Sequence, residues 1–314
     1  MGLVRLLERS RDELNRLDWQ LQTEARAEPV LPDDRIRQVG SLSWLEESDE
    51  GRVWLARLPR LLEECAEQWS LRLEQPFAYA FASLAVPAGD AVLKIQFPDR
   101  ESEHEAEALR VWDGEGAVRL LEHDPERHAL LLERARPGTS LAGVGQDEAL
   151  DVVAELLPRL WKPAGAPFRP VADEAAWWVS YLPERWEQAG RPFERSLLDA
   201  AIEALVELPA AQGELVLVHQ DLHADNVLRA EREPWLVIDP KPLLAEREFS
   251  LTAIVRGDEL GHSRRDVLHR LDRLTSELGL DRDRARRWTL GQTIAWGVDH
   301  PSHVQTARWL LEAA

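Results

Sequence analysis

The sequence predicts an α+β protein with a β-rich first part and a mainly helical second part. Two observations lead to this fold class. Two strand–turn–strand patterns flank a short helical pattern between residues 77 and 135. From about residue 145 onward the pattern is mostly helical, and one small β unit at residues 214–241 interrupts it.

The first part begins with helical patterns. Leucines near helical spacing predict an amphipathic helix over residues 1–26 and a second helix over 51–69. The apolar run FAYAFASLAV (77–86) predicts a strand, PAGD (87–90) a turn, and AVLKIQF (91–97) the returning strand of a hairpin.

A helix and a second hairpin follow. SEHEAEALRVWDG (102–114) predicts a helix that ends at Gly114 and Gly116. Residues 117–124 and 128–135 predict two more strands. Pro137 and Gly138 then break the chain. We therefore expect a first lobe at 1–136, with a helical extension at 1–45, and a second lobe at 137–314.

Composition restricts the class of protein. The 314 residues are 44% hydrophobic and 30% charged, as in a globular chain. The single cysteine, Cys65, excludes an intramolecular disulfide and a multi-cysteine zinc site, in keeping with a cytoplasmic setting. The charged N-terminus does not resemble a signal peptide, and no run is apolar enough to span a membrane.

The net charge of −19 argues against binding to a nucleic-acid backbone, which requires basic patches. Two interpretations of this charge remain open. It can serve solubility alone, or it can attract a cationic substrate over a long range.

The motif with the clearest chemistry is LVLVHQDLHADNVL (215–228), followed by LVIDPK (236–241). Each apolar run ends at polar side chains: Asp221 after the first, Asn226 five residues later, and Asp239 after the second. Such a set suits phosphoryl transfer, because Asp221 can accept the proton of an attacking hydroxyl. Asn226 and Asp239 supply the oxygen ligands that Mg²⁺ prefers.

These two motifs resemble the catalytic and metal-binding loops of aminoglycoside phosphotransferases, and IDPK resembles the branch with streptomycin and hydroxyurea kinases. The resemblance implies a two-lobed, protein-kinase-like fold and an ATP-dependent reaction. It makes Asp221 the catalytic base and Asn226 and Asp239 the Mg²⁺ ligands. It also implies a structural role for His219 and places Lys241 near phosphate or substrate.

The first lobe offers further residues of this kind. Lys94 alternates with apolar neighbours in AVLKIQF, so it points away from Leu93 and Ile95. A kinase requires such a lysine for the nucleotide phosphates, paired with a helix glutamate. The family spacing selects Glu105 rather than Glu103 or Glu107. The segment FAYAFASLA contains no glycine, although a glycine-rich phosphate loop is expected there.

The remaining candidates follow from the resemblance. The run ALLLERARPG resembles the family's hinge, which implies that backbone groups from Glu133 to Ala135 bind adenine. Acceptors in the family bind between the catalytic loop and the C-terminal helices, where the candidates are Glu248, Asp258, Glu259, Trp288, Gln292, Trp296 and Asp299. We expect Trp296 and Asp299, one helical turn apart, to share a face.

The sequence therefore favours an ATP- and Mg²⁺-dependent kinase acting on a hydroxyl of a small polar, cationic acceptor such as an aminoglycoside or amino sugar. Three alternatives remain: a metabolic sugar kinase, a non-catalytic ligand sensor with a kinase fold, and a metallohydrolase. The last is motivated by the alternation of His219, Asp221, His223 and Asp225, which would share one face of an extended chain.

Overall fold

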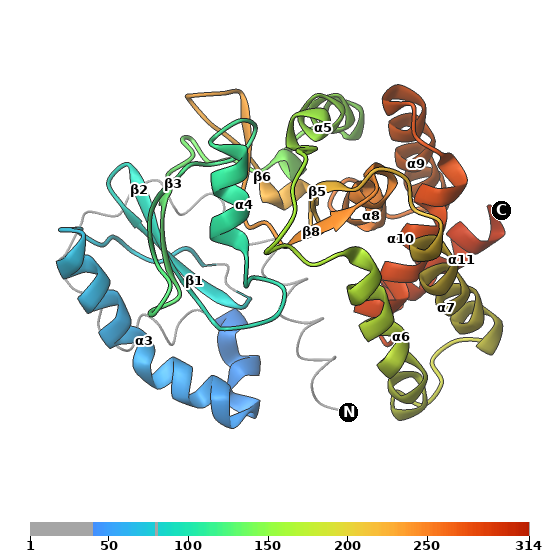
Figure 1. The fold of residues 1–314 in the computed structure, drawn as a ribbon, viewed down its shortest axis with the longest axis horizontal. Helices are drawn as coiled ribbons and strands as arrows, with labels where there is room; N and C mark the ends of the chain where they lie inside the picture. Colours follow the sequence, from blue (N-terminus) through green and yellow to red (C-terminus); the bar gives the residue numbers. More distant parts are fainter. Residues whose placement is uncertain (1–39, 79–80, 314) are drawn as a thin grey trace. The chain divides into compact units, whose positions relative to one another are not determined.

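The computed structural model describes residues 40–78 and 81–313 (Figure 1). The helix predicted over residues 1–26 lies outside this range. The chain forms two compact units. Of the described residues, the first unit takes in those up to Ala106 together with Arg119–Arg134, and the second takes in Glu107–Val118 and those from Ala135 onward. An antiparallel sheet comes first and a mainly helical region follows, which confirms the predicted α+β class.

The sheet of the first unit has four antiparallel strands in the order β1-β2-β4-β3. The strands are β1 (Ser83–Ala88), β2 (Ala91–Gln96), β3 (Leu120–Asp124) and β4 (Ala129–Glu133). Lys94 of β2 lies opposite Ala85 of β1 and Leu130 of β4, in the middle of the sheet. Gly89 closes the β1–β2 hairpin with a φ of +64°, which a glycine adopts without strain.

The strand predicted over residues 77–86 is wrong at its start. Glu74 and Phe77 donate backbone hydrogen bonds to Pro87 and Ala85, so the segment before β1 runs antiparallel to it. The chain therefore reverses direction between Phe77 and Ser83, inside the predicted strand. A continuous apolar run gave no sign of this reversal, because it contains neither glycine nor proline.

One face of the sheet packs against η1 (Gly40–Glu47) and α3 (Asp49–Gln68). Ser48 caps α3 by accepting a hydrogen bond from the backbone of Gly51. Leu93 and Ile95 of β2 belong to this core, together with Leu58, Leu61, Leu62 and Cys65 of α3. Burial raises the pKa of the Cys65 thiol to about 11, so the thiol stays protonated inside the core.

The second unit contains most of the helices. They are α5 (Gln146–Leu160), α6 (Val171–Gln188), α7 (Arg195–Ala210), α8 (Thr252–Arg256), α9 (Arg264–Leu278), α10 (Arg282–Trp296) and α11 (Pro301–Glu312), with short 3₁₀ helices η2 (Leu141–Gly143), η3 (Ala224–Asn226) and η4 (Arg247–Leu251). One further α-helix, α4 (Glu105–Trp112), begins in the first unit and continues in the second. From Trp288 to Ala295 every residue of α10 is buried, as expected for a central helix that contacts α7, α8, α9 and α11.

Two short antiparallel ribbons interrupt the helices of this unit. One pairs β5 (Val216–His219) with β8 (Pro242–Ala245), and the other pairs β6 (Val227–Arg229) with β7 (Trp235–Val237). The strands predicted over 214–221 and 235–241 are thus shorter than expected. The sequence gave no separate prediction for β6 and β8.

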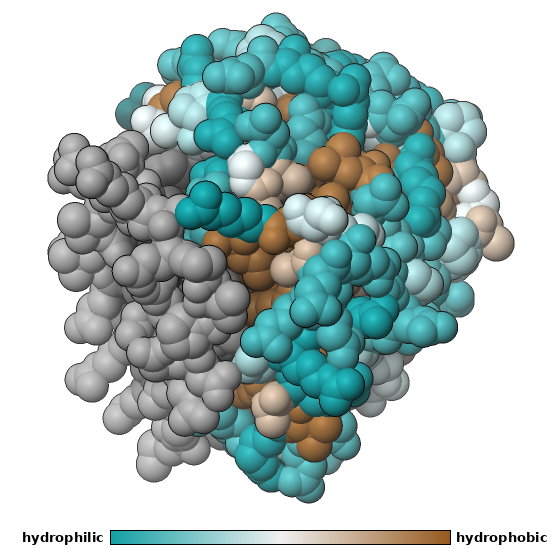
Figure 2. Space-filling model, turned by 90° about the vertical axis from the view of Figure 1, so that its left-hand side faces the viewer, coloured by the Kyte–Doolittle hydropathy of each residue, from teal (hydrophilic) through white to brown (hydrophobic). Residues whose placement is uncertain are grey.

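One face of the described surface is mostly polar (Figure 2). Figure 2 shows one face of the molecule, on which hydrophilic residues predominate and hydrophobic residues occupy smaller areas between them. No helix in the described part of the chain combines the length and the apolar composition that a membrane crossing requires.

Candidate active site

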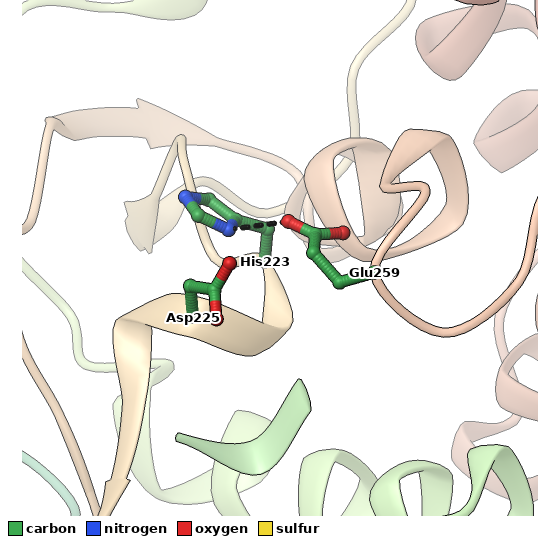
Figure 3. Close-up of side chains that lie close together, drawn as sticks. All are labelled: His223, Asp225 and Glu259. Atoms are coloured by element: carbon green, nitrogen blue, oxygen red, sulfur yellow. Dashed lines mark ion pairs between the residues drawn. The ribbon is translucent and has the colours of Figure 1, made fainter. Parts of the chain in front are cut away.

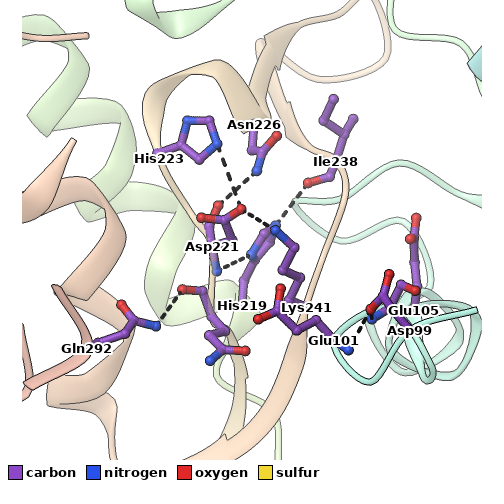
Figure 4. A network of polar contacts seen from close by, with 12 residues as sticks. Asp99, Glu101, Glu105, His219, Asp221, His223, Asn226, Ile238, Lys241 and Gln292 are labelled. Atoms are coloured by element: carbon purple, nitrogen blue, oxygen red, sulfur yellow. Dashed lines mark hydrogen bonds and ion pairs between the residues drawn. The ribbon is translucent and has the colours of Figure 1, made fainter. Parts of the chain in front are cut away.

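The β5–β8 ribbon places Asp221 beside Lys241. His219 lies opposite Pro242, and the backbone of Gln220 donates a hydrogen bond of 3.0 Å to the carbonyl of Lys241. The two residues therefore leave the ribbon at the same end. Lys241 Nζ lies 2.7 Å from Asp221 Oδ2 and donates a hydrogen bond to it (Figure 4).

His219 connects the two ribbons through its ring. Its Nε2 lies 2.9 Å from the carbonyl oxygen of Ile238, and its Nδ1 accepts a hydrogen bond from the backbone of Asp221. The ring is buried and stacks on Trp112 at 6.3 Å. Burial lowers the pKa of His219 to about 4, so the imidazole is neutral, with its proton on Nε2. Both ring nitrogens are thus engaged in holding the loop.

Asn226 directly precedes β6, and Asp239 lies two residues after β7. The backbone of Ile238 donates to the carbonyl of Asn226 at 2.9 Å, which makes Asp239 the next residue beyond this contact. The side-chain nitrogen of Asn226 donates to the backbone oxygen of Asp221 at 2.8 Å. Asp239 adopts a left-handed φ of +54°, which a short polar side chain tolerates. One amide oxygen and one carboxylate form an oxygen donor set that fits Mg²⁺.

Three cations surround the carboxylate of Asp221. Besides Lys241, Arg256 Nη2 lies 3.6 Å from Oδ1, and His223 Nε2 lies 4.0 Å from Oδ2. Burial by itself raises the pKa of Asp221, but the charges of Lys241, His223 and Arg256 outweigh it and hold the pKa well below the usual range. Asp221 therefore stays ionised and acts as a hydrogen-bond acceptor.

His223 forms a partly buried ion pair with Glu259. Its Nδ1 lies 2.7 Å from Glu259 Oε1 (Figure 3). Burial by itself disfavours the charged ring, but the carboxylates of Glu259 and Asp221 outweigh it and raise the pKa of His223 to about 9. Asp225 completes an acidic cluster whose potential ligand atoms lie within 4.8 Å of one another, and it accepts a hydrogen bond from Ser140. In this structure His223 and Glu259 are thus joined by an ion pair, with Asp225 beside them.

This geometry argues against the metallohydrolase alternative. His219 is committed to Ile238 and Asp221 through both ring nitrogens. The residues after it form a turn and then η3, not an extended strand. The four alternating side chains that motivated a shared metal face are therefore not arranged as an extended chain would place them.

Arg256 is a charged residue of this site that the sequence interpretation missed. It is the last residue of α8, and its Nη1 donates to Gln292 Oε1 at 2.8 Å. Its guanidinium lies 4.7 Å from the ring centroid of Trp296, and Lys241 Nζ lies 5.3 Å from the same centroid. The one available signal was position: Arg256 ends the apolar run LTAIV, as Asp221 ends another.

Arg270 of α9 fixes the backbone on both sides of Arg256. It is fully buried and donates hydrogen bonds to the carbonyls of Val255, Gly257 and Gly261. These oxygens lie at the C-terminal end of α8 and in the loop after it, where a positive charge is favoured. Burial lowers the pKa of Arg270 to about 10, so it remains charged at neutral pH. The sequence did not predict this role, because nothing in it distinguishes Arg270 from the many other arginines of the chain.

The first unit holds a buried ion pair between Lys94 and Glu105. The Lys94 Nζ–Glu105 Oε2 distance is 2.5 Å, and Gln96 also donates to Oε2 at 2.7 Å. Both side chains of the pair are almost completely buried. Lys94 is thus paired with the glutamate that the spacing selected. At the end of β4, the backbone N–H of Glu133 donates a hydrogen bond to the carbonyl of Arg119, so this N–H is already used within the unit.

Comparison with known proteins identifies the family. A model described as aminoglycoside/hydroxyurea antibiotic resistance kinase matches residues 69–301. The chain belongs to this family. The protein is therefore a small-molecule kinase of an ATP-using family.

Characterised relatives support this assignment. A streptomycin 6-kinase of Streptomyces griseus is 41% identical over 285 residues, covering 84% of this chain and 92% of that protein. A hydroxyurea phosphotransferase of Kitasatospora aureofaciens is 42% identical over 264 residues, covering 79% of this chain and 76% of that protein.

Solved structures show the same fold. A choline kinase from Streptococcus pneumoniae superimposes with a TM-score of 0.59 at 13% identity, covering 82% of this chain and 98% of that one. The kinase thus has the protein-kinase-like fold that the motifs implied.

The predicted acceptor residues of the kinase fall into two groups. Glu259 and Trp296 belong to the network around Asp221, and Asp258 lies in the same loop as Glu259. Glu248 accepts a hydrogen bond from Asp281, the N-cap of α10, whereas Trp296 is the last residue of that helix, about 20 Å away. The expected helical face shared by Trp296 and Asp299 is wrong, because α10 ends at Trp296.

Proposed function

We propose that the kinase transfers the γ-phosphoryl group of ATP to a hydroxyl of an aminoglycoside, with streptomycin as the first acceptor to test. The observation that carries the proposal is the ionised Asp221 carboxylate, held beside Lys241, with Asn226 hydrogen-bonded to the backbone oxygen of Asp221. The 41% identity to a streptomycin 6-kinase supports the choice of acceptor. We expect the reaction to take place in the cytoplasm, where ATP is available.

Asp221 carries the central step in this proposal. It accepts a hydrogen bond from the acceptor hydroxyl and aligns the oxygen with the γ-phosphorus. The new oxygen–phosphorus bond forms as the bond to the β-phosphate oxygen breaks, ADP leaves, and the acceptor proton passes to Asp221 and then to solvent. Because the pKa of Asp221 is held low, its main contribution is orientation, with proton transfer late in the step.

Other residues hold the nucleotide. Lys94, kept in place by Glu105, binds the phosphates, and backbone groups of Glu133 and Ala135 bind adenine, with Ala135 as the N–H donor. Asn226 and Asp239 would hold Mg²⁺, which would offset the negative charge of the phosphates.

The acceptor would meet carboxylates of the loop after α8. We propose Asp258 and Glu259 from that loop, and Asp299 after α10, as the groups that recognise amino or guanidino groups of the acceptor. Glu259 is already paired with His223, so its role toward the acceptor would be shared with that pair. A second candidate acceptor is hydroxyurea, because the chain is 42% identical to a hydroxyurea phosphotransferase.

The test is ADP release with mass spectrometry of the products, using streptomycin, hydroxyurea and simple amino sugars as acceptors. Wild type should yield a product heavier by one phosphate, and Asp221→Asn should lower turnover by about 10³-fold or more. Asp199→Asn, which alters an exposed ion pair with Arg195 on α7, is the control and should retain wild-type turnover. Wild-type turnover by Asp221→Asn would contradict the role of Asp221 in orienting and deprotonating the acceptor hydroxyl.

A further inference from the structure

Gln96 is a buried polar residue at the end of β2 in the first unit. It lies two residues after Lys94, so both side chains leave the same face of the strand. Leu93 and Ile95 leave the opposite face and pack into the core with α3. A buried amide is costly without hydrogen-bond partners, so the partners of Gln96 indicate what this residue does.

The amide of Gln96 binds the same carboxylate oxygen as Lys94. Gln96 Nε2 lies 2.7 Å from Glu105 Oε2, and Lys94 Nζ lies 2.5 Å from that oxygen. A carboxylate only accepts hydrogen bonds, so the amide must turn its NH₂ group toward Glu105. Oε2 is therefore held from two directions, by a cation and by a neutral donor. A buried ion pair requires such additional hydrogen bonds to be stable.

The backbone of Gln96 is fixed by two other elements. Its N–H donates to the carbonyl of His128 at 2.9 Å, which continues the pairing of β2 with β4. Its carbonyl accepts a hydrogen bond of 3.0 Å from the indole of Trp54 on α3. The amide thus extends from a backbone that the sheet and α3 hold in place. It gives a fixed point against which Glu105, the first residue of α4, is held.

The chain between Gln96 and Glu105 forms a closed loop. Asp99 Oδ1 accepts hydrogen bonds from the backbone N–H groups of Glu101 at 2.7 Å and Ser102 at 2.8 Å. The backbone N–H of Glu105 then donates to the carbonyl of Ser102 at 3.1 Å. The contact between Gln96 and Glu105 joins the two ends of this loop. The start of α4 is therefore connected to the end of β2 through side chains as well as through the main chain.

We propose that Gln96 is a positioning residue for nucleotide binding, which holds the Glu105 carboxylate so that Lys94 is presented to the phosphates of ATP. The inference rests on the proposed function, in which Lys94 binds these phosphates. An ammonium has three N–H donors, so Lys94 can keep one hydrogen bond to Oε2 and direct the others to phosphate oxygens. This arrangement requires Oε2 to stay in place when the nucleotide arrives, and Gln96 donates the hydrogen bond that keeps it there.

The first test compares ADP with adenosine, which has no phosphates, by isothermal titration calorimetry with Mg²⁺. Gln96→Leu should weaken ADP binding by about tenfold and leave adenosine nearly unchanged, because only ADP reaches Lys94 with phosphate oxygens. Gln188→Leu is the matched control. It removes an amide hydrogen bond to Glu184 on the exposed side of α6, and it should leave both affinities unchanged. An unchanged ratio of ADP to adenosine affinity in Gln96→Leu would overturn the proposal.

The second variant, Gln96→Glu, keeps the size of the side chain but replaces the amide donor by a second carboxylate. This group would repel Glu105 and hold Lys94 between two acceptors. ADP should therefore bind more weakly to Gln96→Glu than to Gln96→Leu, again with little change for adenosine. Equal weakening of ADP and adenosine in both variants would show a purely structural role and overturn the proposal. In turnover, KM for ATP should rise about tenfold in Gln96→Leu, whereas KM for streptomycin should change little.

A double-mutant cycle tests whether Gln96 acts through Glu105. In a Glu105→Gln background no carboxylate remains to be held, so adding Gln96→Leu should change the ADP affinity by less than about twofold. A tenfold effect that persists in this background would overturn the positioning role. Failure of wild type to bind ADP would overturn the proposed function as well, whereas normal ADP binding by Gln96→Leu would overturn this inference alone.

Discussion

Two histidines four residues apart illustrate how strongly local surroundings set chemistry at the scale of single residues. His219 is buried against Trp112 and a backbone carbonyl, and it is neutral. His223 lies between two carboxylates, and it is charged. The sequence HQDLH shows that both residues are histidines, but it does not show which groups their rings contact. Glu259, which decides the state of His223, is 36 residues away.

The charge of His223 predicts a dependence of stability on pH. Its pKa is raised from 6.5 to about 9 on folding, so the ion pair stabilises the fold fully below about pH 6.5. That contribution is lost as the pH rises through about 9. The difference in unfolding free energy between wild type and His223→Gln, measured with urea, should therefore shrink between about pH 6.5 and about pH 9.

The exposed pair of His269 with Asp147 provides the control. His269→Gln should change the unfolding free energy little over the same range of pH. A difference between wild type and His223→Gln that does not vary with pH would contradict the assigned charge of His223.

The residues that the sequence could predict are those whose role follows from position in a local pattern. Asp221 follows an apolar strand, and Lys94 alternates with apolar neighbours, so each could be found without a structure. Arg256 and Arg270 could not, because their roles depend on contacts between α8, α9 and α10. Arginine is also abundant in this chain, where only three of the 38 lysines and arginines are lysine.

At the scale of elements, the short ribbons matter most. β5 pairs with β8 over four residues, and β6 pairs with β7 over three. Strands of this length carry almost no periodic signal, and β8 begins at a proline, so the sequence pattern could not separate them from loops. Their pairing nevertheless sets the register of Lys241 against Asp221, which is the most consequential contact of the site.

Glu246, directly after β8, connects this ribbon to α10. Its buried carboxylate accepts hydrogen bonds from Arg284 and from the indole nitrogen of Trp288. Glu246→Ala would leave Arg284 without its carboxylate in a largely enclosed place, and we expect a loss of about 3 kcal/mol of unfolding free energy. Urea unfolding would measure it.

The matched control for Glu246 is on the same helix. Arg287 of α10 pairs with Glu207, whose side chain is 54% exposed. Glu207→Ala should cost less than about 1 kcal/mol, because water replaces the lost partner. Equal losses for Glu246→Ala and Glu207→Ala would contradict the anchoring role of Glu246.

At the scale of the whole molecule, the net charge of −19 affects association with the acceptor. The net negative charge attracts a cationic acceptor over a range set by the Debye screening length. This length falls from roughly 20 Å at about 20 mM salt to roughly 7 Å at about 200 mM. With saturating ATP and Mg²⁺, KM for streptomycin should therefore rise several-fold across this range. KM for hydroxyurea, which is uncharged, should change little if it is also an acceptor, and equal changes would contradict steering by charge.

The single cysteine has a practical consequence for measuring motion in this kinase. Cys65 is fully buried under the sheet of the first unit, and its thiol is protonated at neutral pH. Maleimide dyes react with exposed thiolates, so the native chain should give almost no background labelling. A cysteine introduced at one exposed site in each unit could then carry a fluorophore pair without removal of Cys65. Energy transfer between the dyes would follow the two units as nucleotide and acceptor bind.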